Sequence, residues 1–241
     1  MSSEQERPQA ALEWMTDGTA RLLTAMSKLG DAELGAPTLL PGWNRRHLLS
    51  HVANNASALR NLVYWARTGE RRRMYESEEQ RAADIERDSA LPAGELRARV
   101  ATTAVDLEVD LDGLPAPAWS ARIVTAQGLT RFASEIPWMR AREVCIHAID
   151  LGTGVAFADL PPEFLAALTG DVTARRSSAG NCPAVTATAT DTGATWTVTG
   201  AGDPARVAAP LATLAQWLSG RPVTGLADAA GQPVPPLPPW L

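Results

Sequence analysis

The chain has few of the residues that usually form disulfides or bind metals. It contains 241 residues, of which only two are cysteines and three are histidines. Two cysteines rule out a disulfide framework and agree with a reducing compartment. The scarcity of histidine restricts any histidine-based metal site to a few combinations of positions.

Long apolar runs and a strong excess of one charge are also missing. No stretch approaches the ~20 apolar residues that a membrane-spanning helix needs. The first residues are polar and acidic and lack the basic start and apolar segment of a secretory signal. The net charge is −5, and the one basic cluster, residues 71–73, is typical of a solvated loop. We therefore expect a cytoplasmic protein that binds neither membranes nor nucleic acid.

The first half of the chain carries the apolar periodicity of α-helices. Four segments are predicted to be helical: residues 11–29, 45–68, 92–113 and 136–152. Asn44 is a favourable N-cap for the second segment, and Gly69 is a typical C-terminal stop. The charged stretch 70–88 is predicted to be part helix and part loop. These segments together predict a helical bundle.

The second half has the pattern of a small α+β domain. Valine, threonine and tryptophan alternate with other residues on the two sides of Asp191-Thr192-Gly193, which predicts a β-hairpin. The expected elements are a helix at 161–168, strands at 185–190, 195–199 and 206–209, and a helix at 210–218. The composition changes near residues 152–162, so we predict two domains, 1–155 and 156–241.

A candidate metal site lies on the last helix of the predicted bundle. Glu143 and His147 are four residues apart, so their side chains share one face of the helix. His51, on the second predicted helix, becomes a third ligand if the two helices are neighbours. Zinc accepts histidine and carboxylate ligands, and three protein ligands leave one position open. The predicted triad is therefore His51, Glu143 and His147.

Two other residues near this triad are open to different interpretations. His47 and His51 are also four residues apart, so His47 is either a fourth ligand or, as we favour, a residue that caps the helix or supports a ligand. Cys145 points about 160° away from Glu143 and His147 around the helix, which indicates a buried structural cysteine. Glu-xxx-His spacing by itself is also common on solvated helices.

Several runs resemble the mycothiol-dependent maleylpyruvate isomerase family. The runs are LPGWNRRHLLSHVANN (40–55), NLVYWARTG (61–69), EQRAADIE (79–86), PWMRAREV (137–144), HAIDLG (147–152) and QWLSGR (216–221). Each run alone is a weak signal, but their combination is specific and covers nearly the whole chain. Cys145 and Ala148 depart from the residues expected at those two positions, which leaves the substrate open.

The resemblance implies a fold, a metal and a set of site residues. It implies a DinB-like four-helix bundle followed by a small sterol-carrier-like α+β domain, in a monomeric actinobacterial protein. It implies zinc bound by His51, Glu143 and His147, with mycothiol as the thiol cosubstrate. Arg221 matches the position of an arginine that faces the active site, and Arg81 is a second candidate for binding a substrate carboxylate.

The family's reaction would be a cis–trans isomerisation of a small molecule. The thiolate of mycothiol adds to the cis double bond of a maleylpyruvate-like substrate, the resulting single bond rotates, and loss of the thiol leaves the trans product. A mycothiol S-transferase would use the same thiolate but release a conjugate. A non-catalytic metal- or ligand-binding protein is the third interpretation, and a fourth protein ligand would favour it.

Overall fold

The structure is a computed structural model that describes residues 6–235, 237 and 238. The chain divides into two compact units, one ending at Val155 and the other beginning at Ala156. Among the described residues, no helix is both long enough and apolar enough to cross a membrane.

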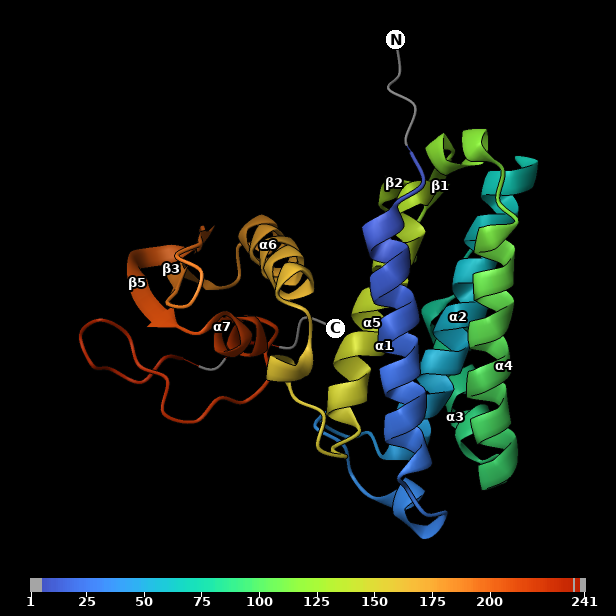
Figure 1. Cartoon of the computed structure of the whole chain (residues 1–241), viewed down its shortest axis with the longest axis horizontal. Helices are drawn as coiled ribbons and strands as arrows, with labels where there is room; N and C mark the ends of the chain where they lie inside the picture. Colours follow the sequence, from blue (N-terminus) through green and yellow to red (C-terminus); the bar gives the residue numbers. More distant parts are fainter. Residues whose placement is uncertain (1–5, 236, 239–241) are drawn as a thin grey trace. The chain divides into compact units, whose positions relative to one another are not determined.

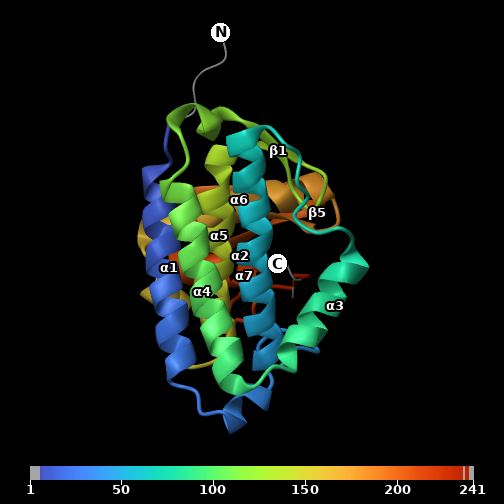
Figure 2. The same cartoon turned by 90° about the vertical axis from the view of Figure 1, so that its right-hand side faces the viewer.

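The first unit is a four-helix bundle with one additional helix (Figure 1). The bundle helices are α1 (Gln9–Ser27), α2 (Arg45–Thr68), α4 (Ala93–Asp112) and α5 (Ile136–Asp150). Helix α3 (Glu78–Ser89) packs on α2 outside the four, as Figure 2 shows. Contacts of α2 with α4 and α5, and of α1 with α5, bury the apolar stripes of all four helices. The helical bundle expected from the sequence is confirmed.

Local sequence signals define both ends of α2. The Asn44 side chain accepts a hydrogen bond from the backbone N–H of His47 at 3.1 Å, which caps the first turn. Gly69 ends the helix with a φ of 77°, a left-handed conformation that glycine adopts without steric cost. Both ends agree with the sequence prediction. Because Leu48 and Val52 are fully buried, the face that carries His51 turns toward the other helices.

Helices α1 and α5 approach each other closely at Gly18. A Cβ atom at this position would lie 2.5 Å from the Sγ atom of Cys145 and 2.7 Å from Cγ2 of Val144. Both neighbouring side chains are short and buried, so they have little freedom to move away. The absence of a side chain at Gly18 therefore sets the spacing of this helix pair.

We expect Gly18→Ala to destabilise the bundle even though alanine is the better helix former. The gain in helix propensity is about 1 kcal/mol, whereas overpacking a tight core costs roughly 1–3 kcal/mol, and here the added methyl overlaps two atoms. Urea unfolding should show a net loss of stability. Gly94→Ala in α4 is the matched control, because nothing lies within 4 Å of its added Cβ, and it should be neutral or stabilising. Equal stability of the two variants would contradict the close approach at Gly18.

A short hairpin that the sequence did not predict joins α4 to α5. Strands β1 (Arg122–Val124) and β2 (Thr130–Phe132) pair antiparallel, with Ile123 opposite Arg131. Each strand has only three residues, too few to show an alternating apolar pattern. Ile123 is fully buried, so the hairpin packs against the bundle.

In its described residues, the second unit contains two α-helices and a three-stranded β-sheet. Helix α6 (Pro162–Ala179) precedes strands β3 (Pro183–Ala189), β4 (Thr195–Val198) and β5 (Ala201–Ala209), and helix α7 (Leu211–Leu218) follows them. The strand order is β4-β3-β5, with β3 antiparallel to β4 and parallel to β5. The predicted hairpin and the predicted α+β class are confirmed.

Two element lengths in this unit were predicted wrongly. Helix α6 continues to Ala179 rather than ending at residue 168, because Thr169, Val172 and Thr173 are buried against the rest of the unit. Strand β5 begins at Ala201 rather than at residue 206. Before it, the chain crosses the start of β3 at Gly200, where a Cβ would lie 2.1 Å from the carbonyl oxygen of Cys182. Only glycine fits this crossing.

Candidate metal centre

Two neighbouring helices bring the three predicted ligands together in the first unit. His51 comes from α2, and Glu143 and His147 come from successive turns of α5. Oε2 of Glu143 lies 2.9 Å from Nε2 of His51 and 3.2 Å from Nε2 of His147. One ligand atom from each residue lies within 4.8 Å of the other two. Both histidines are buried and the Glu143 side chain is 14% exposed, so the group is largely shielded from water.

The hydrogen bonds of His147 indicate that this cluster requires a bound cation. Nδ1 of His147 lies 2.9 Å from Oδ2 of Asp150, which is fully buried. A carboxylate at this position holds the proton on Nδ1 and leaves the lone pair of Nε2 directed at Glu143. Two electron-pair donors, Nε2 of His147 and Oε2 of Glu143, then face each other. Such a pair requires a cation between them, either a proton or a metal ion, so the residues fit a divalent metal.

Burial and the close contacts shift the pKa of each group in the cluster. Burial by itself would raise the pKa of Glu143, but hydrogen bonds with His147 and His51 hold that pKa well below its usual value. Burial would lower the pKa of His147, but the contacts with Asp150 and Glu143 raise it instead. Burial lowers the pKa of His51 despite the contact with Glu143. A neutral His51 and an ionised Glu143 are the forms that bind metals.

Arg81, the predicted substrate-binding residue, contacts one of the ligands directly. Nη2 of Arg81 lies 3.1 Å from Nδ1 of His51. A guanidinium only donates, so Nδ1 accepts this bond and the proton of His51 sits on Nε2, where it donates to Glu143. A metal ion bound at Nε2 would move the proton to Nδ1, and two donors would then face each other. Arg81 must therefore turn away from His51 when Nε2 binds a metal.

We expect Arg81→Met to strengthen metal binding. The substitution removes the hydrogen bond that keeps the proton of His51 on Nε2, the nitrogen that would bind the metal. It also removes a positive charge beside the site. Together these changes should raise the metal affinity about tenfold. Titration of the metal-free protein with metal in the presence of a competing chelator would measure the affinity. Arg67→Met, which removes the same charge from an exposed position near the end of α2, is the control and should leave the affinity unchanged. Weaker binding in the Arg81 variant would contradict the tautomer argument.

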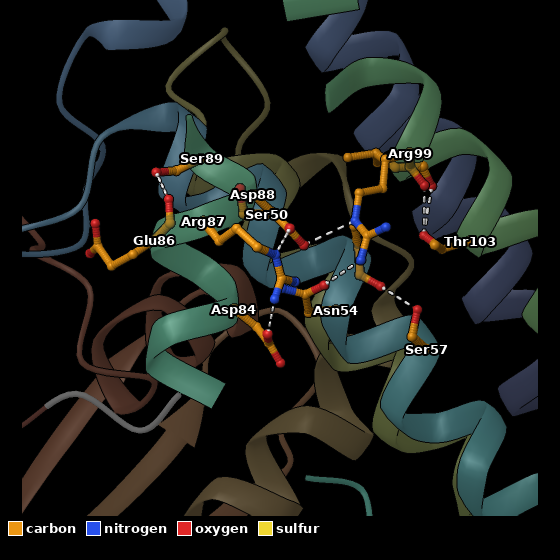
Figure 3. Close-up of polar contacts among 12 residues, drawn as sticks. Ser50, Asn54, Ser57, Asp84, Glu86, Arg87, Asp88, Ser89, Arg99 and Thr103 are labelled. Atoms are coloured by element: carbon orange, nitrogen blue, oxygen red, sulfur yellow. Dashed lines mark hydrogen bonds and ion pairs between the residues drawn. The ribbon is translucent and has the colours of Figure 1, made fainter. Parts of the chain in front are cut away.

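An ion-pair network around the buried carboxylate of Asp88 fixes the position of α3 (Figure 3). Asp88 lies between two arginines, with Nε of Arg87 and Nε of Arg99 each 3.0 Å from one of its carboxylate oxygens. Arg99 also donates to Oδ1 of Asn54 on α2 at 3.1 Å. The network thus joins α3 to both α2 and α4. Arg81 lies about two turns before Asp88 on the same helix, so the network holds it beside His51.

The other histidine and the nearby cysteine do not belong to the cluster. His47 forms a capping box with Asn44, and its Nε2 lies 3.4 Å from Oε1 of Glu86. The expectation that His47 caps the helix is confirmed. Cys145 is buried, its Sγ lies 3.8 Å from the backbone oxygen of Trp14 on α1, and burial raises the pKa of its thiol to about 12. It is the inert structural cysteine that the helical geometry predicted.

Arg221, the predicted catalytic residue, belongs to the second unit. It follows α7, its side chain is buried, and Nη1 donates to the backbone oxygen of Ser219 at 2.9 Å. Its relation to the three ligands remains a prediction that comes from the family resemblance.

Four residues near the cluster were not predicted from the sequence. Asp150 contacts His147, and the ring centroid of Trp43 lies 5.3 Å from that of His51. Burial and then the nearby charge of Glu143 raise the pKa of Tyr75, whereas burial lowers the pKa of Arg140 and the charge of Glu143 opposes that shift. Only Asp150 had a local signal, because it follows His147 by three residues on one helix. Trp43 and Tyr75 lie in loops, where periodicity gives no information.

The fold and the site together define a class of protein. A four-helix bundle that directs two histidines and a carboxylate inward from facing helices is typical of metal-binding bundle proteins. The sequence profile described as "Mycothiol maleylpyruvate isomerase N-terminal domain" matches residues 6–152. The chain therefore belongs to the mycothiol maleylpyruvate isomerase family, and the resemblance found in the sequence is confirmed.

Solved structures of that enzyme extend the similarity to the second unit. The crystal structure of the mycothiol-dependent maleylpyruvate isomerase is 36% identical, covers 97% of each chain and has a TM-score of 0.92. A crystal structure of a variant of that enzyme, in which one histidine is replaced by alanine, is 35% identical with the same coverage and TM-score. A comparison with curated proteins found no match.

Proposed function

We propose that this protein is a mycothiol-dependent cis–trans isomerase of a maleylpyruvate-like substrate. We also propose that His51, Glu143 and His147 hold a divalent metal ion, zinc in the first instance. The observation that carries the proposal is the buried pair of facing electron-pair donors, Oε2 of Glu143 and Nε2 of His147, with Nε2 of His51 beside them. Similarity to the isomerase over 97% of both chains supports the choice of reaction.

Each of the site residues would have a separate role in the reaction. A bound divalent ion supplies positive charge that lowers the pKa of a nearby thiol. Asp150 fixes the ring of His147, and the buried surroundings of the cluster exclude water from the reacting groups. Arg81 and Arg221 would each hold a carboxylate of the substrate, because a guanidinium matches carboxylate geometry.

The reaction itself conserves all atoms of the substrate. The thiolate forms a C–S bond to one carbon of the cis double bond, and the electron pair moves to the adjacent carbonyl as an enolate. The remaining single bond rotates, the carbonyl re-forms, and the C–S bond breaks to release the thiolate and the trans isomer. An arginine that binds the carboxylates also stabilises the negative charge of the enolate.

Metal analysis combined with a mycothiol-dependent assay tests this proposal. The purified protein should contain about one divalent ion per chain, and maleylpyruvate should isomerise only when mycothiol is present. Mass spectrometry should show a product of unchanged mass. A product heavier by one mycothiol would instead identify an S-transferase. Stoichiometric metal without any thiol-dependent reaction would identify a binding protein.

A further inference from the structure

Arg140 is an unusual residue for the interior of this bundle. It lies on α5 one turn before Glu143, and only 1% of its surface is exposed. Nη1 donates to the backbone oxygen of Val52 at 2.8 Å and to Oδ1 of Asn55 at 2.9 Å, both on α2. Both acceptors are neutral. Nη2 is buried and has no hydrogen-bond partner among the residues that the structure describes.

The fold does not require a charge at this position. Burying a guanidinium against neutral partners costs stability, and an apolar side chain of similar volume often fills such a position at lower cost. Burial lowers the pKa of Arg140 to about 10, although the charges of Glu143 and Tyr75 oppose the shift. Arg140 nevertheless stays protonated at neutral pH. Costly buried charges are typical of functional sites.

The surroundings of Arg140 connect it to the candidate metal centre. Val52 directly follows His51, and Asn55 lies one turn after His51 on the same helix. The two hydrogen bonds therefore fix the guanidinium between the helices that carry the three ligands. Two titratable groups act on it, Glu143 from its own helix and Tyr75 from the segment before α3, while α2 offers it only neutral acceptors.

We propose that Arg140 is a positioning residue whose positive charge stabilises the anionic form of a thiol that binds beside Glu143. This inference rests on the proposed function, because it requires a thiol at the site. A thiolate and a carboxylate-bearing substrate bring negative charge to a cluster that already contains Glu143 and Asp150. The free Nη2–H and the unpaired charge of Arg140 offset part of that repulsion at a distance.

The test replaces zinc by Co²⁺, whose bond to a thiolate gives a charge-transfer absorption band, and uses N-acetylcysteine as the probe. The pH midpoint of the band measures the pKa of the bound thiol. For Arg140→Met the midpoint should rise by about one pH unit, the effect of a removed charge at several ångströms in a medium of intermediate polarity. Arg140→Lys keeps the charge and should stay closer to the unsubstituted protein.

Further measurements separate the charge from the packing. Arg67→Met is the control, because Arg67 is an exposed arginine about 24 Å along α2 from His51, and its midpoint should not move. Arg140→Met should unfold at a temperature no lower than the unsubstituted protein, since it removes a costly buried charge. If Arg140→Met does not fold, Arg140→Gln gives the same comparison, because it keeps an amide donor for Val52.

The possible outcomes distinguish this inference from the proposed function. An equal midpoint in the unsubstituted protein and in the neutral Arg140 variant overturns the role of Arg140 but leaves the thiol site intact. Absence of any thiol-dependent band in the unsubstituted cobalt protein overturns the proposed function itself. A midpoint that rises in the neutral Arg140 variant but not in the Arg67→Met control supports both the role of Arg140 and the proposed function.

Discussion

His51→Ala should abolish metal binding and, with it, thiol-dependent activity. His51 supplies the one ligand atom that comes from α2, 2.9 Å from the carboxylate of Glu143. Loss of a residue that only supports a ligand already costs roughly 10–100-fold in metal affinity, so loss of a ligand itself should cost more. Metal analysis after gel filtration in a weak chelator would measure the content directly.

His47→Ala is the matched control for this experiment. His47 lies one turn earlier on the same helix and belongs to the capping box, outside the three-residue cluster. Its loss should cost about 1 kcal/mol of stability, as for other N-terminal caps, and should leave the metal in place. Full metal content in the His51 variant would show that the ligands have been assigned wrongly. Loss of metal in the His47 variant would indicate a fourth ligand and favour a binding protein over an enzyme.

Asp150→Asn should weaken metal binding roughly 10–100-fold near neutral pH. Asparagine has nearly the same shape and still accepts the proton of Nδ1 of His147, but it lacks the charge that makes the opposite nitrogen more basic. Isothermal titration of metal-free protein over a range of pH would measure the affinity. An unchanged affinity at every pH would contradict a role for Asp150 in the site.

The pH dependence of this effect has a definite sign. The pKa of His147 is raised, because the contacts with Asp150 and Glu143 outweigh burial. Below that raised pKa a proton occupies His147 and competes with the metal. Removing the Asp150 charge lowers the pKa of His147, so the variant loses less affinity on acidification. The difference between the two proteins should therefore shrink as the pH falls through the folded-state pKa of His147.

The same pKa shift affects the stability of the metal-free protein. A group whose pKa is higher in the folded state contributes stability below its unfolded value and loses it as the pH rises through the folded value. The contribution of His147 to stability is thus greatest in acid and absent in alkali.

A buried carboxylate elsewhere in the bundle provides the control for Asp150. Asp88→Asn weakens the ion pairs with Arg87 and Arg99 that hold α3 (Figure 3). It should lower the stability of the bundle without weakening the binding of metal by the three ligands. Equal effects of the two substitutions on metal affinity would mean that general loosening of the bundle, rather than the His147 contact, controls binding.

Features that depend on near neighbours in the chain could be predicted from the sequence alone. Asn44 and Gly69 define the ends of α2 because a cap satisfies backbone groups within a few residues. Glu143 and His147 share a face because four residues make about one turn of a helix. The β3–β4 hairpin follows from alternation around a turn that contains Gly193.

Features that depend on contacts between distant segments were decided only by the tertiary structure. The approach of His51 to Glu143 requires α2 and α5 to pack together, although the two residues are 92 positions apart in the chain. The contact of Arg81 with His51 depends on an ion pair and a hydrogen bond that together join three helices. Arg140 could not be recognised from the sequence as a residue of the site, because its hydrogen-bond acceptors lie on α2, 88 and 85 residues away in the chain. Local propensity thus set both ends of α2, whereas long-range packing set the length of α6 and decided which side chains meet.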